Sequence, residues 1–247
     1  MTAGRNGTAP PLSRAPLPHA LPHSQALNLK IRLADQGLSA ALAGLWRGDG
    51  DLLPRYGRYL AAMHQVIRAS VPLMELAGAR CAERGDADAL SAPLAAYLAR
   101  HITEERDHDQ WLLEDMAVLH GSRGPASAPW AGAAAARLVG AQYYWIEHCH
   151  PVSLLGYMAV LEGRAPAAWL AARLASLTGL PATAFRTVHA HAALDPGHAG
   201  ELDALLDSLP LSGAETAAIG ASALHTVGAL TDLLTEISVP RPGGNRA

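Results

Sequence analysis

Eight of the 12 histidines in this sequence lie between positions 101 and 198. Within that region His191, Asp195 and His198 are spaced at i, i+4 and i+7, so on a helix they share one face. Their neighbours are rich in alanine and leucine, and a His-Asp-His stripe is costly to bury unless each group has a partner. A bound metal ion is one partner that imidazole and carboxylate groups accept, so the spacing predicts a metal site.

A second set of polar residues lies earlier in the chain. Glu105 and His108 are three residues apart, which predicts that they lie one turn apart on a single helix face. His101 falls on nearly the same stripe. We expect His101 and Trp111 to support the site or contact a substrate rather than bind metal, and we expect Glu104 to face away from Glu105.

Glu162 ends an apolar run, which is an unusual place for a carboxylate unless the end of the run faces a polar site. Two first-row metal ions would use all the candidate ligands, whereas one ion would be over-supplied. Mixed nitrogen and oxygen ligands suit iron or manganese, and zinc is less natural because no CxxC motif is present. The predicted ligands are three imidazoles and three carboxylates: Glu105, His108, Glu162, His191, Asp195 and His198.

The residues just before Glu162 are candidates for the wall of a substrate cavity. We expect His150 and Tyr157 to line it, and we expect Gly156 to allow close approach of another helix. No residue is assigned as a catalytic nucleophile.

The elements that must position these side chains are predicted to be helices. Apolar residues recur at helical spacing, and no alternating strand pattern is present. We predict a single all-α domain, a seven-helix bundle over residues 24–238, between a disordered arm (1–23) and a flexible tail (239–247). The expected helices cover about 24–47, 52–84 with a kink or division at Pro72, 86–120 as one helix or a helix pair, 131–162 with an interruption at 150–151, 165–178, 182–209 and 212–237.

Two local signals refine these boundaries. Ser212 and Glu215 form a capping-box pattern at the start of the last helix. Pro196 and Gly197 lie between two predicted ligands, and proline disfavours helical backbone at the residue before it. We therefore expect the helix to be kinked or marginal at residues 195–198, and we expect metal binding to order it.

Composition excludes several classes of protein. Half of the residues are hydrophobic, 17% are charged and the net charge is −3, which excludes a disordered chain and a basic nucleic-acid binder. Two cysteines provide no disulfide framework, so a reducing, cytoplasmic location is expected. No apolar run reaches about 18 residues, so no membrane span is expected.

The ordered ligand set resembles the heme-oxygenase-like diiron oxidases and oxygenases, over roughly residues 25–237. Their hallmark is a late His-x-x-x-Asp-x-x-His, here His191 to His198, with an earlier Glu/His pair and a mid-chain Glu. Ferritin-like diiron bundles use Glu-x-x-His twice, and this sequence has only the copy at Glu105 and His108. The resemblance therefore favours the heme-oxygenase-like family.

The resemblance implies a heme-oxygenase-like fold and two iron ions, with manganese as an alternative. It implies that O2 is activated for N-oxygenation, C–H hydroxylation, desaturation or C–C cleavage of a small organic substrate, often in natural-product biosynthesis. Many members are homodimers. Neither nucleic acid nor a membrane is expected as a partner.

Three other interpretations compete with this one. A thiaminase-like enzyme needs no cofactor and uses a cysteine nucleophile, for which Cys149 is the candidate, but the six-ligand set would then have no purpose. A true heme oxygenase needs a histidine on an early helix, and His19 and His23 precede the first expected helix. A non-catalytic ligand-binding bundle would leave the polar stripe unexplained.

Overall fold

The computed structural model describes residues 21–121 and 132–239, and these residues form helices joined by short connections, without β-strands. The predicted all-α class is confirmed, but the described residues form more helices than the seven predicted. The helices are α1 (His23–Ala34), α2 (Gln36–Leu45), α3 (Leu52–Ile67), α4 (Ser70–Arg84), α5 (Ser91–Glu105), α6 (His108–His120), α7 (Ala133–His148), α8 (Leu154–Glu162), α9 (Leu170–Thr178), α10 (Arg186–Ser208) and α11 (Gly213–Ser238), with 3-10 turns at Gly85–Ala87, Pro151–Ser153 and Ala182–Phe185.

The higher number arises because four of the predicted helices each form two. They divide at Asp35, at residues 68–69, at residues 106–107 and at residues 149–153, where an interruption was expected. Pro72 lies in the first turn of α4, where proline is tolerated, so it marks the start of a helix rather than a kink. Residues 1–20 and 240–247, which hold most of the predicted arm and tail, lie outside the described residues.

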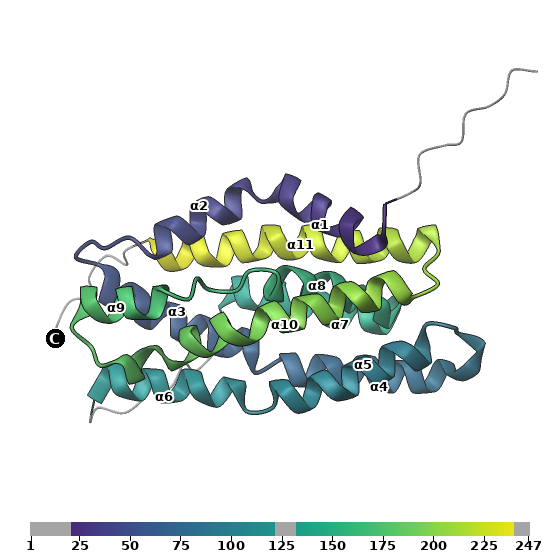
Figure 1. The fold of residues 1–247 in the computed structure, drawn as a ribbon, viewed down its shortest axis with the longest axis horizontal. Coiled ribbons are helices and arrows are strands. Elements are labelled where there is room, and N and C mark those ends of the chain that lie inside the picture. The colour runs from purple at the N-terminus through teal and green to yellow at the C-terminus, as the bar shows by residue number, and fades with distance from the viewer. Residues whose placement is uncertain (1–20, 122–131, 240–247) are drawn as a thin grey trace, which may run out of the picture.

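The helices run mostly along the long axis of the molecule (Figure 1). The last helix, α11, extends along the bundle, with α1 and α2 on one side of it and α8 on the other, and it packs against all three. On the far side of the bundle, α4 packs against α5 and α3 packs against α6. Helix α10 lies between these layers and contacts α1, α6 and α8.

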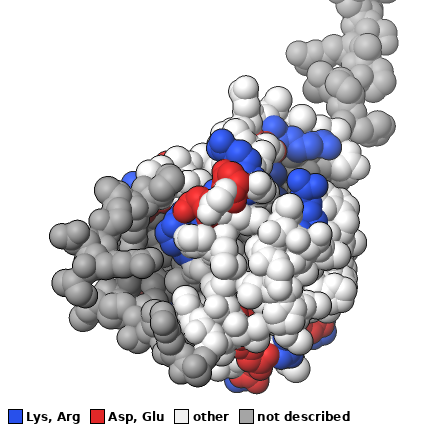
Figure 2. Space-filling model, turned by 90° about the vertical axis from the view of Figure 1, so that its left-hand side faces the viewer, with Lys and Arg blue, Asp and Glu red and all other residues white. Residues whose placement is uncertain are grey.

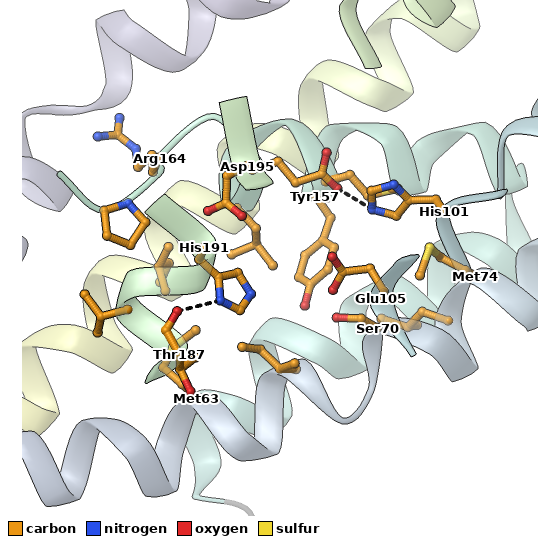
Figure 3. Close-up of a pocket in the computed structure, with 18 of the residues that line it drawn as sticks. Met63, Ser70, Met74, His101, Glu105, Tyr157, Arg164, Thr187, His191 and Asp195 are labelled. Atoms are coloured by element: carbon orange, nitrogen blue, oxygen red, sulfur yellow. Dashed lines mark hydrogen bonds and ion pairs between the residues drawn. The ribbon is translucent and has the colours of Figure 1, made fainter. Parts of the chain in front are cut away.

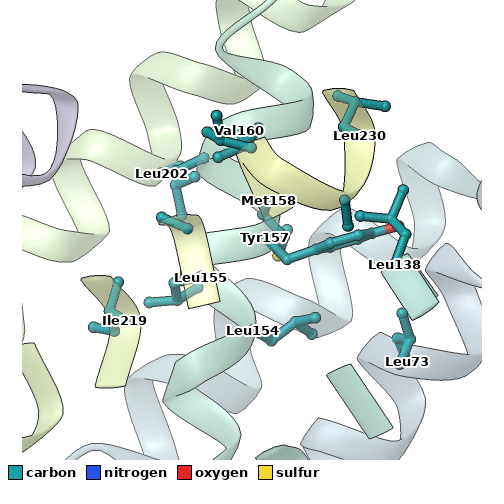
Figure 4. Packing of buried hydrophobic residues seen from close by; sticks show 14 of the residues in the cluster. Leu73, Leu138, Leu154, Leu155, Tyr157, Met158, Val160, Leu202, Ile219 and Leu230 are labelled. Carbon is teal, nitrogen blue, oxygen red and sulfur yellow. The ribbon is translucent and has the colours of Figure 1, made fainter. Parts of the chain in front are cut away.

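The contact between α8 and α11 is unusually close. A Cβ atom on Gly156 would lie 2.1 Å from the carbonyl oxygen of Ile219 and 2.7 Å from the amide nitrogen of Ala223. Only glycine fits this position, as the sequence analysis expected. Figure 4 shows the buried apolar side chains around this contact, including Leu155 and Tyr157 of α8.

Helix α11 is long and apolar enough to cross a membrane by length and composition alone, which the sequence analysis did not anticipate. In the structure, 56% of its apolar 18-residue window is buried. Its capping box is present as predicted, with Ser212 accepting the Glu215 amide and Glu215 accepting the Ser212 amide. In this fold α11 is therefore the central helix of the core.

Charged side chains of both signs meet at the end of the bundle where α2 turns into α3. The guanidinium of Arg55 is only 3% exposed; it donates to the Leu45 carbonyl oxygen at 2.7 Å and to Asp49 at 3.0 Å, while Arg58 pairs with Asp51 at 2.7 Å. Figure 2 shows this end of the molecule, with Lys/Arg and Asp/Glu gathered in the upper part of the view and a mostly uncharged surface below them. These ion pairs hold the connection between α2 and α3 in place.

Buried apolar residues form two clusters. The larger lies around α4, α5, α8 and α11. The smaller lies around α3, α6, α9 and the start of α10, and its centre includes Tyr56 and Phe185, the single phenylalanine of the chain. Helix α10 contributes Val188 to the smaller cluster and Leu202 to the larger one. The predicted polar stripe therefore lies on α10 between the two clusters.

Candidate metal centre

The first turn of α10 is held by a buried carboxylate. Asp115 on α6 is fully buried, and its two oxygens accept the backbone N–H groups of Arg186 and Thr187, each at 3.0 Å. These are donors that a helix start leaves without partners. Asp115 therefore fixes both where α10 begins and how it is rotated; the sequence analysis did not identify this residue.

This anchor also orients His191. Its Nδ1 lies 2.9 Å from the carbonyl oxygen of Thr187 (Figure 3). A carbonyl only accepts, so Nδ1 carries the proton and Nε2 keeps its lone pair. Burial lowers the pKa of His191, which favours the neutral ring. A neutral imidazole with one nitrogen held by a backbone carbonyl is the usual arrangement of a histidine metal ligand.

Helix α10 continues through Pro196 without a break, and the expected kink or weakness at residues 195–198 stays a prediction. Its second half packs against α1 and α8 through buried residues such as Leu202 and Leu206. This packing outweighs the local preference of the proline–glycine pair. As a result, Asp195 and His198 are both buried.

Glu105 and His108 lie together, but not for the predicted reason. Glu105 is the last residue of α5 and His108 is the first residue of α6, so they do not share one helix. Between them Asp107 has left-handed backbone with φ of 68°, a conformation that aspartate tolerates better than most residues. The break still leaves Glu105 Oε2 and His108 Nδ1 only 3.2 Å apart.

Ligand-type side chains from these elements form two separate groups. In each group, two imidazoles and one carboxylate offer atoms that lie within 4.8 Å of one another. Two histidines and one carboxylate are the protein ligands typical of non-heme iron oxygenases. One group is His101, Glu104 and His198, and the other is Glu105, His108 and His191.

The first group contains two residues that the sequence analysis did not count as ligands. Glu104 Oε2 lies 3.5 Å from Nε2 of His198 and 3.7 Å from Nδ1 of His101. The expectation that Glu104 simply faces away is therefore wrong, although 44% of its side chain is exposed. The ring centroids of His101 and His198 are 4.6 Å apart. The i, i+3 spacing of His101 and Glu104 was the available signal.

Glu105 lies between the two groups. Its Oε2 faces His108 at 3.2 Å, and its Oε1 lies 3.6 Å from Nδ1 of His198. Burial raises the pKa of Glu105, but the close contact with His108 and the other nearby imidazoles lower it overall, which favours the carboxylate. The Glu105 side chain is 12% exposed, and each of its oxygens faces a histidine of a different group.

Glu162 and Asp195 add two more carboxyl groups. Glu162 Oε1 accepts a hydrogen bond from Nε2 of His101 at 3.0 Å. Burial lowers the pKa of His101, but Glu162 and the other nearby carboxylates raise it overall. Burial, then the negative charges of Glu105 and Glu162, raises the pKa of Asp195 to about 8. A bound cation would relieve this concentration of negative charge.

Several buried polar atoms in this region have no hydrogen-bond partner among the described residues. Among them are four atoms at the two groups, namely Nδ1 of His101, His108 and His198, and Oε2 of Glu162. Such atoms are rare in folded proteins, and each calls for an explanation. All four belong to the candidate ligands, and imidazole nitrogen and carboxylate oxygen suit iron or manganese. The residues present therefore fit a pair of first-row ions.

The remaining predicted site residues divide into two sets. Trp111 lies beside the two groups, with its ring centroid 3.9 Å from that of His108 and 5.9 Å from that of His191, and Tyr157 lines the adjacent cavity. His150 does not line the cavity. Its Nε2 lies 3.0 Å from Asp88 and its Nδ1 accepts the Val152 amide, because it caps the 3-10 turn before α8.

A cavity of about 160 Å³ opens next to the second group (Figure 3). Glu105, His191 and Asp195 form part of its wall, and most of the other lining residues are apolar. Neither cysteine lines it: Cys81 is buried elsewhere and Cys149 is exposed. The arrangement places the candidate ligand groups beside a mostly apolar cavity.

The sequence matches no protein-family model and no curated protein. Its structure is similar to a domain of unknown function with a heme oxygenase-like fold from Shewanella denitrificans, at 17% identity and a TM-score of 0.71, covering 86% of this chain and 90% of that one. This chain has a heme oxygenase-like fold.

Two further solved structures agree with this fold. A TenA homolog from Pseudomonas syringae is 15% identical, with a TM-score of 0.67, over 88% of this chain and 93% of that one. Heme oxygenase-1 from the cyanobacterium Synechocystis, in complex with heme, is 15% identical, with a TM-score of 0.58, over 87% of this chain and 92% of that one. The heme oxygenase-like fold therefore supports different chemistries, and the side chains must decide the function.

Proposed function

We propose that this protein is a non-heme oxygenase or oxidase that holds two iron ions, or manganese in their place, and oxidises a small organic substrate with O2. The observation that carries the proposal is the position of Glu105. Its Oε2 faces His108 of its own group, and its Oε1 faces His198 of the other group. One ion would leave one of these groups, and its buried imidazoles, without a partner.

The ligand assignment differs in part from the one expected from the sequence. His101, Glu104 and His198 would hold one ion, and Glu105, His108 and His191 would hold the other. Glu162 and Asp195 lie beside these groups and would complete the coordination or accept hydrogen bonds from bound water. When bound, the ion pair supplies the electrons and the site for activating O2.

The protein itself would orient the ligand side chains and exclude water from the cavity. The Thr187 carbonyl keeps the proton of His191 on Nδ1 and so directs Nε2 toward the cavity. The Trp111 ring shields His108 and His191, and the Arg186 guanidinium lies over that ring at 5.1 Å. The apolar cavity wall keeps a substrate next to these groups with little competing water.

Metal counting on matched variants tests the proposal. The protein is loaded with Fe(II) without oxygen, desalted, and its iron is measured; we expect about two ions per chain. His191→Ala should lose at least one of them, and O2 consumption should fall to background. His189→Ala is the matched control, because His189 is exposed on the same helix. One ion per chain in the unaltered protein, or unchanged iron in His191→Ala, would overturn the proposal.

The cofactor-free alternative draws support from the similarity to a TenA homolog. We favour the metal centre because neither cysteine lines the cavity, while the buried imidazole and carboxylate atoms need a cation. The two functions respond differently to a chelator. Activity that survives complete removal of metal would favour the cofactor-free enzyme.

A further inference from the structure

The inner cavity meets a surface groove at a single side chain. The groove has a volume of about 450 Å³ and lies between α1, α8 and α10. Arg164, which follows α8, is the one residue that lines both the groove and the inner cavity. Figure 3 shows Arg164 at the edge of the pocket, on the opposite side from Glu105 and His101. The groove therefore leads to the cavity past Arg164.

An ion pair lies across this passage. The Arg164 guanidinium pairs with Asp35, which lies at the break between α1 and α2. Asp35 lines the groove but not the inner cavity, and each of the two side chains is 21% exposed. A molecule that moves from the groove into the cavity must displace this pair.

The segment that carries Arg164 has little else to hold it. Residues 163–169, between α8 and α9, have no helical structure. Within the described part of the chain, the only side-chain hydrogen bond from this segment to another element is the one from Arg164 to Asp35. A segment with few hydrogen bonds to its surroundings opens locally at a low free-energy cost.

Both charges of the pair have a second partner within the groove. Arg32 lies three residues before Asp35, and Asp203 lies on α10; both line the groove. If the pair separates, Arg32 would pair with Asp35 and Asp203 with Arg164, so neither charge is left alone. The closed arrangement also leaves the buried Nε of Arg164 without a partner among the described residues, which costs free energy. The two arrangements therefore differ little in free energy.

We propose that the Arg164–Asp35 ion pair is a gate, which closes the passage between the groove and the inner cavity and opens when the two side chains exchange partners. The gate goes beyond the proposed function, because it controls the entry of any small molecule into the cavity, with or without metal. A gate acts on the barrier that a ligand crosses in both directions. Its removal speeds entry and exit by the same factor and leaves the affinity unchanged.

The test measures exchange of an uncharged probe that neither side chain binds. Fluorobenzene suits it, since an apolar cavity of roughly 150 Å³ binds benzene in another protein. Fluorine NMR exchange spectroscopy on the metal-free full chain gives its dissociation constant and its exit rate. Arg164→Met and Asp35→Asn each remove one charge. We expect each to raise the entry and exit rates about threefold to tenfold and to change the dissociation constant less than about twofold.

Three further variants separate a gate from a general loss of structure. Asp35 also accepts the Ser39 hydroxyl at 2.6 Å, so Ser39→Ala removes that bond, keeps the ion pair and should leave both rates unchanged. Arg137→Met breaks an exposed pair with Asp232 on other helices and should have no effect. The double variant Arg164→Met/Asp35→Asn should be no faster than either single variant, because both remove the same interaction. Circular dichroism confirms that each variant is folded.

Four outcomes would overturn the inference. They are rates that Arg164→Met and Asp35→Asn leave unchanged, rate increases that multiply in the double variant, an affinity that changes as much as the exit rate, and no binding of fluorobenzene to the unaltered chain or to any variant. All are measured on the metal-free protein, so iron counting is independent of them. The proposed function can therefore fail while the gate holds, and the reverse.

Discussion

The α8–α11 contact and the centre between α5, α6 and α10 are both buried in the middle of the bundle, yet they are built in opposite ways. At the first, Gly156 lets two backbones touch and apolar side chains fill the surroundings. At the second, four histidines and several carboxylates face one another, and four of their polar atoms lack hydrogen bonds within the described residues.

The difference shows which part of the core is complete without a ligand. The α8–α11 contact needs nothing further, since its groups are apolar or paired within helices. At the centre, burial and then the nearby carboxylates Glu105 and Glu162 raise the pKa of Asp195 to about 8, and several imidazole nitrogens lack partners that a cation would supply. Stability should therefore depend mainly on the first region and metal binding mainly on the second.

Gly156→Ala should have the largest effect on folding. Its new Cβ would lie 2.1 Å from the Ile219 carbonyl oxygen, so α8 and α11 must separate, and we expect a loss of about 3 kcal/mol or more. Gly140→Ala on α7 is the control, because its Cβ meets nothing within 4 Å; it should be neutral or slightly stabilising. Urea denaturation measures both. Equal stability of the two variants would contradict the described contact.

Glu105→Gln should leave the fold intact and reduce metal binding most sharply. The amide keeps the shape but removes the charge between the two groups, so we expect iron to fall from about two ions per chain to about one or fewer. Glu104→Gln should cost less, because Glu104 is 44% exposed and touches only the first group. Iron analysis and thermal unfolding are measured together. Equal iron in both variants and in the unaltered protein would argue against a bridging role for Glu105.

Metal should stabilise the chain and protect α10 in particular. A ligand at 100 times its Kd stabilises the folded state by about 2.7 kcal/mol. Because Pro196 and Gly197 weaken the backbone between Asp195 and His198, hydrogen exchange should slow more over residues 188–205 than over α11. Exchange is measured by mass spectrometry with and without Fe(II), in the absence of oxygen. Equal protection of residues 188–205 in the two states would contradict the expectation.

The smallest expected effect is a loss of folding stability at low pH, caused by protonation of Asp88 at the start of α5. Asp88 accepts the Leu90 amide at 3.0 Å and the Ser91 hydroxyl at 2.6 Å, and it pairs with His150. Burial raises the pKa of Asp88, but these bonds outweigh burial and lower it. The carboxylate therefore stabilises the fold above its unfolded pKa of about 3.9, and this contribution disappears as the pH falls through the lower folded value.

The matching variant is Asp88→Ala. It should cost about 1 kcal/mol at pH 7 and less at pH values below about 3. Denaturation at several pH values measures the difference. A constant difference across that range would mean that the charge of Asp88 does not matter.

Much of the fold was predictable from local pattern. Apolar periodicity identified the helical class, and the capping box at Ser212 and Glu215 marked the start of α11. The breaks were harder to predict, because Pro196 continues inside α10, whereas the chain breaks at Asp107 without a proline or glycine. Tertiary packing decides such cases, and a single sequence does not contain it in readable form.

The sequence predicted which residues come together at the candidate centre, but not how they divide into two groups. All six predicted ligands lie in one region, yet the two groups include His101 and Glu104, which helical spacing had placed in lesser roles. The prediction that His150 lines the cavity was wrong, because the turn before α8 directs its side chain toward Asp88. Spacing along one helix is readable, whereas the angle at which two helices meet is not.

The left-handed backbone of Asp107, between α5 and α6, affects how such a centre could change in evolution. His101 and Glu104 belong to one helix and His108 to the next, so the distance between the two groups depends on the backbone at Arg106 and Asp107. Substitutions at these two positions would tune the ion-to-ion spacing without replacing a ligand. The reactivity of such a centre could therefore change through substitutions in the α5–α6 connection, while the coordinating side chains stay the same.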